Sequence, residues 1–342
     1  MSRNHLAAAG VFVLVAGCSF GAINGFAQLA DDRAAAILSV DDEGDRVYVG
    51  TYTSGDRWDA TAKITAYNSS TGASTGTTSA WTGTWKTRAV STDPNDTSVW
   101  TLHDTGHLVN WPRDLGTWSS YDLSVFAAPS GHTLERMCDL EVLDDELYLA
   151  TGISSDNGSD YGFFQLVEPN PSGSGAWRRS TTYTQIDIPV AEGASCPRIA
   201  VDPFDADRFV VLWPERTLTG GPQVDIYEQT SSVSGGLTYQ GYSWTGDSIT
   251  PSDDTKHSYT DVATTDGGVV LAYSYLYGVS SGESMVIYLD DGSFDTATGL
   301  PEVAALDIAG WVTNTADYLW WSGEEDETGS TFELGTIRVT SP

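Results

Sequence analysis

From residue 36 onward, one pattern of apolar and polar positions recurs along the chain. Each copy has a short apolar run, then a turn rich in Asp, then a stronger run of β-branched and aromatic residues. Short runs bounded by turn residues are typical of β-strands. No segment shows a sustained period of 3.6 residues, so helices are not expected. The second run of each copy begins at Val47, Val99, Leu147, Phe209, Val269 and Tyr318.

These six starts are separated by 52, 48, 62, 60 and 49 residues. Short strands in units of about fifty residues are the signature of a β-propeller, in which each blade has four antiparallel strands. The sequence therefore predicts an all-β fold, a six-bladed β-propeller. The last repeat is one strand short, and we expect a segment just upstream of Ile37 to close the ring. A seven-bladed propeller is the alternative, if the interval 147–209 or 209–269 contains a further blade.

The first residues have the pattern of an export signal. Arg3 is followed by an unbroken run of apolar and small residues, 6–15. This run is too short to span the roughly 30 Å hydrocarbon core of a membrane. It leads into Val15–Cys18 (VAGC), which resembles the lipobox of bacterial lipoproteins. The match departs at one position, because the family prefers Leu three places before the Cys and here Leu14 lies one place further back.

The lipobox resemblance implies that Cys18 is acylated and becomes the mature N-terminus. Residues 1–17 are then the signal peptide, residues 18–33 the lipidated Cys with a tether, and residues 34–342 the propeller. Ser19 resembles the outer-membrane sorting pattern of such lipoproteins. We therefore expect an exported protein, lipid-anchored at the outer membrane or cell surface. The alternative is ordinary signal cleavage after Ala27, which would leave Cys18 in the discarded peptide.

The net charge limits the kinds of partner that the protein can bind, and the cysteine count limits its disulfides. The chain has 47 acidic and 16 basic residues, with a formal net charge of -31. This charge argues against nucleic acid and against an anionic membrane surface, so we expect membrane contact through the lipid anchor only. Three Cys exclude a disulfide-dense scaffold. Because Cys138 and Cys196 both lie at the start of a first strand in neighbouring repeats, we expect them to form a disulfide after export.

The familiar catalytic signatures are missing from the sequence, including GxSxG, the P-loop and HExxH. His103 and His107 flank a turn without a third metal ligand, so we expect them to be solvated. Acidic loops such as 202–207 and 324–327 suit Ca²⁺. With 47 carboxylates, however, we favour a solvated acidic surface. No cofactor is expected, with Ca²⁺ as the alternative.

The segment Ser154–Tyr161 (SSDNGSDY) resembles the Asp-box of sialidase-like propellers, SxDxGxTW, with the final Thr and Trp replaced. Residues 264–268 offer a partial second copy. Tight hairpins favour Asp and Gly in any family. In sialidase-like propellers the box is structural, so the resemblance implies a fold and no catalytic role.

A charged residue recurs just before the apolar part of the first strand in repeats two to six. In a propeller the first strand of each blade lines the central channel, so we expect these side chains to converge at one mouth of it. Repeat one has Ala36 at this position. The five charged residues are Arg88, Asp139, Arg198, Asp261 and Asp307.

Two interpretations fit this set of charges. In the first, salt bridges join the blades, with Arg88 and Arg198 bridging to Asp139 between them, because buried charges need partners. In the second, the two Arg side chains hold an anionic ligand while the carboxylates bind hydroxyl groups or act as acid and base.

The acidic part of the set is the more promising for a ligand. Asp261 and Asp307 are in adjacent repeats, and Ala36 offers them no partner. Two carboxyl groups brought together favour protonation of one of them, which prepares general acid chemistry or cation capture. We expect the side of the channel with Asp261, Asp307 and Tyr259 to be the most hydrated and the most functional.

The sequence therefore predicts an exported, lipid-anchored β-propeller that acts as a surface binding or scaffold module for an unknown protein or glycan. The alternative is a glycan-active hydrolase or lyase with its site at the mouth of the channel, because such enzymes commonly use two carboxylates. Propellers support unrelated functions, so the fold does not choose between these. Whether the protein is an enzyme stays open on the sequence.

Overall fold

The computed structural model describes the chain in segments from Arg33 to Val339. In these segments every regular element is a β-strand, and none is a helix of the length and hydropathy that a membrane span requires. The described residues are 33–41, 44–52, 63–78, 86–93, 98–116, 119–124, 126–143, 147–168, 178–179, 188–190, 196–202, 205–216, 221–229, 237–245, 257–265, 268–275, 285–290, 293–297, 304–312, 317–324 and 332–339.

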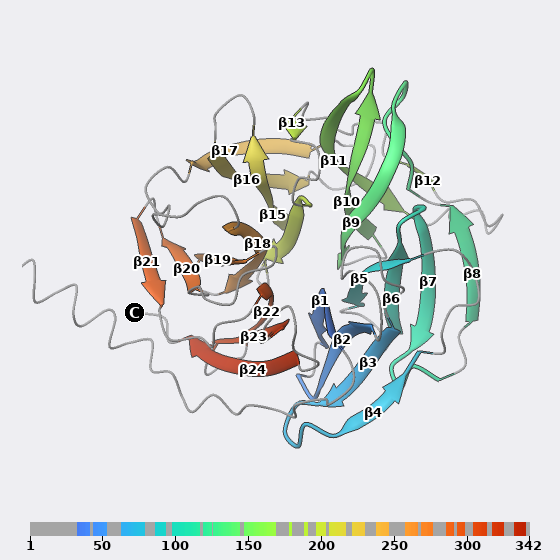
Figure 1. Cartoon of the computed structure of the whole chain (residues 1–342), viewed down its shortest axis with the longest axis vertical. Coiled ribbons are helices and arrows are strands. Elements are labelled where there is room, and N and C mark those ends of the chain that lie inside the picture. Colours follow the sequence, from blue (N-terminus) through green and yellow to red (C-terminus); the bar gives the residue numbers. More distant parts are fainter. Residues whose placement is uncertain are drawn as a thin grey trace, which may run out of the picture.

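The strands pair in chain order into antiparallel sheets that lie around a common centre (Figure 1). Blade 1 consists of β1 (Arg33–Val40), β2 (Arg46–Tyr52), β3 (Lys63–Asn68) and β4 (Ser74–Thr77). Blade 2 consists of β5 (Thr87–Thr92), β6 (Ser98–His103), β7 (His107–Pro112) and β8 (Ser119–Ser124).

The next two blades contain the longest strands. Blade 3 consists of β9 (Thr133–Leu143), β10 (Leu147–Asp156), β11 (Ser159–Glu168) and the short β12 (Arg178–Arg179), and β13 (Ile188–Val190) also pairs with β11. Blade 4 consists of β14 (Arg198–Asp202), β15 (Asp205–Arg216), β16 (Gly221–Gln229) and β17 (Leu237–Thr245).

The last two blades are joined by one parallel pair, Tyr275 with Ala304. Blade 5 consists of β18 (His257–Thr265), β19 (Gly268–Tyr275), β20 (Met285–Asp290) and β21 (Ser293–Ala297). Blade 6 consists of β22 (Ala304–Val312), β23 (Asp317–Glu324) and β24 (Phe332–Val339).

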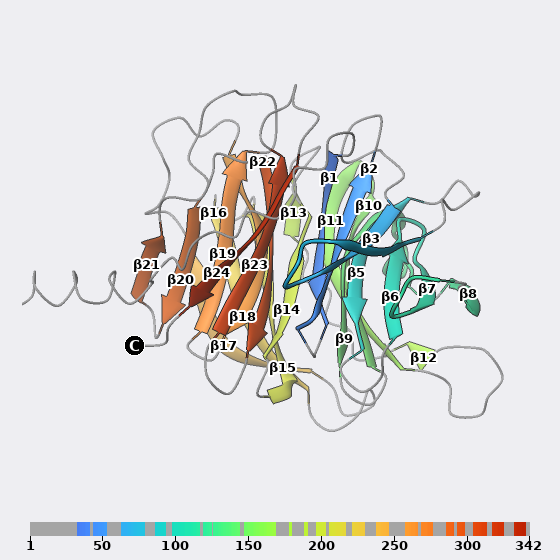
Figure 2. The ribbon, with the colours of Figure 1, turned by 90° about the horizontal axis from the view of Figure 1, so that it is seen from below.

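The first strand of each blade lies at the centre, and these inner strands form a closed ring. Contacts join β1 to β5, β5 to β9, β9 to β14, β14 to β18, β18 to β22 and β22 back to β1. From the side, the strands run between the two ends of this ring (Figure 2). The prediction of an all-β propeller is confirmed. In the described residues of the two long sequence intervals, every strand belongs to blades 3, 4 or 5.

The expected completion of the last blade is not seen in the described residues, where blade 6 has three strands. Residues 33–36, just upstream of Ile37, belong to β1, the inner edge strand of blade 1. Residues 1–32, with the signal, Cys18 and most of the tether, lie outside the described part of the chain.

Apolar side chains on both faces of each sheet fill the spaces between blades. Between blades 3 and 4, Phe164 contacts Tyr227 with ring centroids 4.9 Å apart, and Tyr227 stacks on Phe209. Between blades 6 and 1, Trp320 packs with Val47. Burial of such surface contributes about 25 cal/mol per Å² of apolar area. Burial on both faces explains why a strand such as β15 contains an unbroken run of buried apolar residues, 209–213.

Cys138 of β9 and Cys196, just before β14, are joined by a disulfide with their Cα atoms 5.5 Å apart. This is the pair that the sequence predicts. Both cysteines lie in the apolar cluster between blades 3 and 4. The disulfide therefore ties two neighbouring blades beside the channel.

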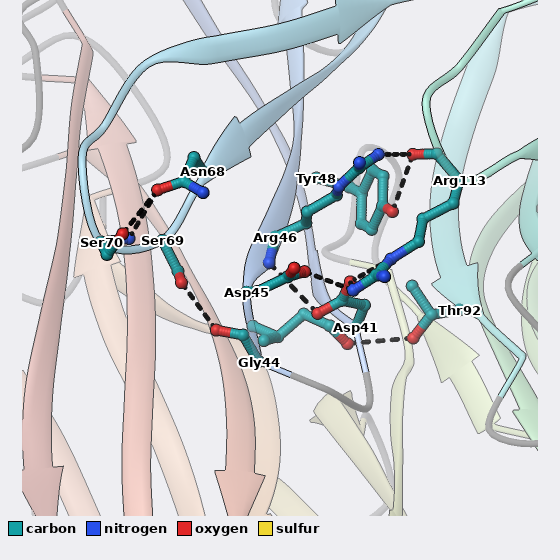
Figure 3. Close-up of polar contacts among 11 residues, drawn as sticks. Asp41, Gly44, Asp45, Arg46, Tyr48, Asn68, Ser69, Ser70, Thr92 and Arg113 are labelled. Carbon is teal, nitrogen blue, oxygen red and sulfur yellow. Dashed lines mark hydrogen bonds and ion pairs between the residues drawn. The ribbon is translucent and has the colours of Figure 1, made fainter.

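A polar joint links the β1–β2 turn of blade 1 to the end of β7 in blade 2 (Figure 3). The guanidinium of Arg113 donates to Asp41 Oδ2 from Nε at 2.8 Å and from Nη2 at 2.5 Å, and it also contacts Asp45. The carbonyl oxygen of Arg113 accepts hydrogen bonds from Arg46 Nη1 at 2.7 Å and from Tyr48 Oη at 3.0 Å. Burial raises the pKa of Asp41, and Arg113 opposes that rise. One residue thus connects two blades through both its side chain and its backbone.

Candidate functional site

The candidate site is a cavity of about 150 Å³ on the axis of the ring. All six inner strands contribute to its wall, so it is the central channel that the sequence predicts. Its charged lining residues are Asp139, Glu141, Arg198 and Asp261. Three of these four were expected from the recurring position, and Glu141 was not.

The pairing between the first and second strands of a blade is irregular near the recurring charged position. The pairing of the first and second strands shifts between Thr87 and Ala89 in β5, around Cys138 in β9, and between Tyr259 and Asp261 in β18. A similar shift occurs upstream of Asp307 in β22. β-bulges bend a strand and re-aim side chains. In four of the five repeats the charged position therefore lies at or next to a shift in this pairing, whereas the pairing at Arg198 in blade 4 is regular.

Asp139 joins blade 3 to blade 4. Its Oδ2 accepts a hydrogen bond from the backbone N–H of Ile199 at 2.9 Å, and its Oδ1 accepts one from the N–H of Leu140 at 2.9 Å. Arg198 Nη1 lies 4.0 Å from Oδ1, and the side chain of Asp139 is 16% exposed. Burial raises the pKa of Asp139 to about 6, with Arg198 opposing the rise and Asp261 adding to it.

Asp261 has the corresponding role between blades 5 and 6. Its Oδ2 accepts a hydrogen bond from the backbone N–H of Ile308 at 2.7 Å. Asp261 is only 5% exposed. We expected this side of the channel to be the most hydrated, but the buried Asp261 is less accessible than Asp139. The neighbouring blade approaches closely enough for its backbone N–H to satisfy this carboxylate, as it also does for Asp139.

The remaining predicted residues divide into two groups. Arg198 is buried in the channel wall near Asp139. Arg88 is half-buried on β5 and does not line the cavity. Tyr259 lies in β18 and Asp307 in β22, while the positions of their side chains lie outside the described structure. The expected approach of Asp307 to Asp261 therefore stays a prediction.

Glu141 is the channel residue that sequence reasoning missed. Ser91 of β5 donates to Glu141 Oε2 at 3.1 Å, and the N–H of Val142 donates to Ser91 Oγ at 3.1 Å. Burial raises the pKa of Glu141 well above its ordinary value, and the charge of Asp139 adds to the rise. Glu141 follows Asp139 by two residues on the same strand. Side chains two residues apart point to the same face of a β-strand, so this spacing could have identified Glu141 as a channel residue.

Hydroxyl groups continue the inter-blade contacts around the ring. Thr92 of blade 2 donates to the carbonyl oxygen of Val40 in blade 1 at 2.9 Å. Thr264 of blade 5 donates to the carbonyl oxygen of Val201 in blade 4. These bonds satisfy backbone groups that the inner edge of each sheet leaves unpaired. These polar contacts of the channel wall therefore connect neighbouring blades.

One of the two histidines considered as metal ligands differs from expectation. His103 is buried at 1% exposure, so the expectation that it is solvated is wrong. Burial lowers the pKa of His103 to about 4, and His107 contributes to the lowering. The reason is that β6 lies between β5 and β7 in blade 2, and all of its residues after Ser98 are buried. Among the described residues, no group of three His, Cys, Asp or Glu side chains is arranged to hold a metal ion.

The Asp-box-like segment forms the hairpin between β10 and β11. Asp156 pairs with Ser159, and the turn residues Asn157 and Gly158 have φ angles of 51° and 81°. Left-handed conformations at both turn positions are typical of a tight two-residue hairpin, which favours Asn-Gly. Turn geometry alone therefore accounts for this sequence.

Comparisons with known proteins support the fold only. No protein-family model matches the chain, and no curated protein matches it. A solved gluconolactonase from Xanthomonas campestris is similar to the chain at 14% identity and a TM-score of 0.54, covering 94% of this chain and 92% of that one. A putative gluconolactonase is similar at 12% identity and a TM-score of 0.51, covering 93% and 97%. At such identities the likeness concerns the propeller architecture.

Proposed function

We propose that the chain is an exported, lipid-anchored β-propeller that acts as a surface binding or scaffold module. The observation that supports this best is that two charged side chains of the channel bind the backbone of a neighbouring blade. Asp139 and Asp261 each accept a hydrogen bond from the backbone of the next blade, at Ile199 and Ile308. A carboxylate occupied in this way stabilises the ring and has less capacity left for a substrate.

The arrangement of arginines also favours a scaffold over an enzyme for anionic sugars. Such an enzyme needs at least two Arg side chains beside a carboxylate pair, because guanidinium groups bind carboxylates in pairs of hydrogen bonds. Arg198 lines the cavity, whereas Arg88 does not. The ligand of a scaffold would then bind across the ends of the ring, where loops of several blades meet.

Anchoring and recognition are tested separately. In a Gram-negative host, the full chain should fractionate with membranes and take up labelled palmitate, and Cys18→Ser should abolish both. Soluble protein carrying this substitution is then assayed on a panel of neutral and acidic glycosides and sugar lactones. The proposal predicts no turnover above that of the Asp139→Asn variant. Turnover that depends on Asp139 would overturn the scaffold role.

The second candidate is a hydrolase with its site in the channel, and Glu141 favours it. Burial and the charge of Asp139 raise the pKa of Glu141 well above its ordinary value, so Glu141 keeps its proton to a higher pH than an exposed Glu, and Asp139 beside it has a pKa of about 6. Two carboxyl groups with different protonation states are suited to general acid and base roles. Of the solved structures of similar fold, one is described as a gluconolactonase and another as a putative gluconolactonase. In this case Glu141→Gln should retain the fold and lose the activity.

A further inference from the structure

The acidic groups of the channel also lie at the joints of blade 3 with its two neighbours. Glu141 is held by Ser91 of blade 2, and the same hydroxyl accepts the N–H of Val142. On the other side, Asp139 holds the N–H of Ile199 in blade 4. Two carboxyl groups on one strand, β9, therefore fix a blade on both sides.

The charged groups that face Glu141 come from few of the surrounding elements. Asp139 lies on its own strand, Asp261 on β18 and Arg198 on β14, and all three line the same cavity. From β5 the facing polar group is Ser91. The cavity lining from β1, residues 37–40, and from β22, residues 308–310, contains no charged side chain. Among the described residues, the charged groups of the cavity wall are therefore three carboxyl groups and one guanidinium.

We propose that the channel is a pH-responsive joint: as the medium becomes less acidic, ionisation of Glu141 and Asp139 sets three carboxylates against one another and loosens the contacts of blade 3 with blades 2 and 4. The ring is tighter in an acidic medium than in a neutral one. This device does not depend on what the propeller binds.

The direction follows from proton linkage. The pKa of Asp139 rises from 3.8 to about 6 on folding, and the pKa of Glu141 rises well above 4.5. The folded state then binds more protons than the unfolded state in these intervals, so stability falls as the pH rises through them. His103 acts in the opposite sense, because its pKa falls from 6.5 to about 4 on folding, and protonation below pH 6.5 destabilises the folded state.

The test compares urea unfolding of wild type, Glu141→Gln and Glu135→Gln from pH 5.5 to 8.5. Glu135 is exposed on the same strand and does not line the cavity, so it is the matched control. His103 is present in all three proteins, and its contribution cancels in the comparison. Relative to Glu141→Gln, the unfolding constants of wild type and of Glu135→Gln should rise together across this range, by about a factor of ten for each pH unit over which Glu141 holds its proton only in the folded state.

Amide hydrogen exchange locates the effect. After correction for intrinsic rates, the N–H groups of Val142 and Ile199 should lose protection with rising pH in wild type and keep it in Glu141→Gln. Equal pH dependence in Glu141→Gln and Glu135→Gln would overturn the proposal. A difference in unfolding without any change at these two amides would overturn it as well. If Glu141→Gln does not fold, Asp139→Asn replaces it in the same comparison, with the same expected loss.

Discussion

The carboxylate of Asp139 accepts a hydrogen bond from the backbone N–H of Ile199, 2.9 Å away and 60 residues further along the chain. Asp261 makes the same contact with Ile308 at 2.7 Å. In both pairs the Asp lies on the inner strand of one blade, and the amide lies on the inner strand of the next. The charged position that recurs in the sequence is thus a joint between blades.

The first prediction concerns the acceptor in this joint. Asp261→Ala should lower the free energy of unfolding by about 1–3 kcal/mol, because it leaves the buried N–H of Ile308 without a partner. Asp261→Asn retains an acceptor oxygen and should cost less than about 1 kcal/mol. Urea unfolding at pH 7 measures both. Equal losses in the two variants would show that the hydrogen bond is not the relevant contact.

Arg198 should stabilise the ring in a pH-dependent way. Arg198→Ala removes the cation 4.0 Å from Asp139, and loss of one partner from a buried pair costs about 3–5 kcal/mol at most. We expect a smaller loss at pH 5 than at pH 8, because Asp139 has a pKa of about 6 and is largely protonated at the lower pH. Unfolding curves of wild type and variant at both pH values measure the difference. A loss that is the same at both would contradict the pairing.

The disulfide should be a major constraint on the unfolded chain. Cys138 and Cys196 are 58 residues apart in sequence, and closing a loop of this length contributes about 4 kcal/mol in the chain-entropy model. The double variant with Ser at both positions should unfold at lower urea concentration. Wild type treated with dithiothreitol is the control and should behave like the variant. Unchanged midpoints in both samples would refute this role.

Arg113 should hold blades 1 and 2 together through the N–H groups of its guanidinium. Arg113→Ala leaves the buried Asp41 without its cation and should cost about 1–3 kcal/mol. Arg113→Lys keeps the charge but cannot donate from two nitrogens to Asp41 in the same way, so an intermediate loss is expected. Thermal unfolding of the three proteins gives the order. Full stability in Arg113→Lys would mean that charge alone matters.

Gly310 should not tolerate a side chain. A Cβ at this position would meet the carbonyl oxygen of Thr264 in blade 5, closer than real Cβ atoms approach an oxygen. Gly310→Ala should therefore push β22 away from β18 and cost about 1–3 kcal/mol. Gly116→Ala is the control, because its new Cβ would meet only the side chain of Asp114. A destabilisation as small as that of the control would contradict the close approach.

The fold could be predicted because the same sequence pattern recurs in every blade. Each blade repeats one alternation of apolar strands and turns, and this pattern depends on local chemistry such as the hairpin at Asn157 and Gly158. The disulfide could be predicted from the same alignment, since Cys138 and Cys196 occupy nearly equivalent places in adjacent repeats. The periodicity of the sequence thus predicts both the propeller architecture and which residues of adjacent blades lie close together.

The site was only partly predictable, because the hydrogen-bond partners of its aspartates are backbone groups. No side-chain pattern identifies the N–H of Ile199 as the partner of Asp139, since every residue except proline carries such a group. Glu141 was overlooked because it does not recur in other repeats. His103 was taken for a hairpin residue at the surface, and its burial depends on how blade 2 packs, which a single strand does not reveal.

The most direct test of the account is the exchange rate of the Ile308 amide hydrogen in wild type, Asp261→Asn and Asp261→Ala at one pH. If the inner-strand carboxylates join the blades, Ile308 is protected in wild type and in Asp261→Asn, and it exchanges about tenfold or more faster in Asp261→Ala, as the loss of one buried hydrogen bond requires. If Ile308 exchanges at the same rate in all three proteins, the carboxylate does not hold the next blade, and the channel charges are available for a ligand instead.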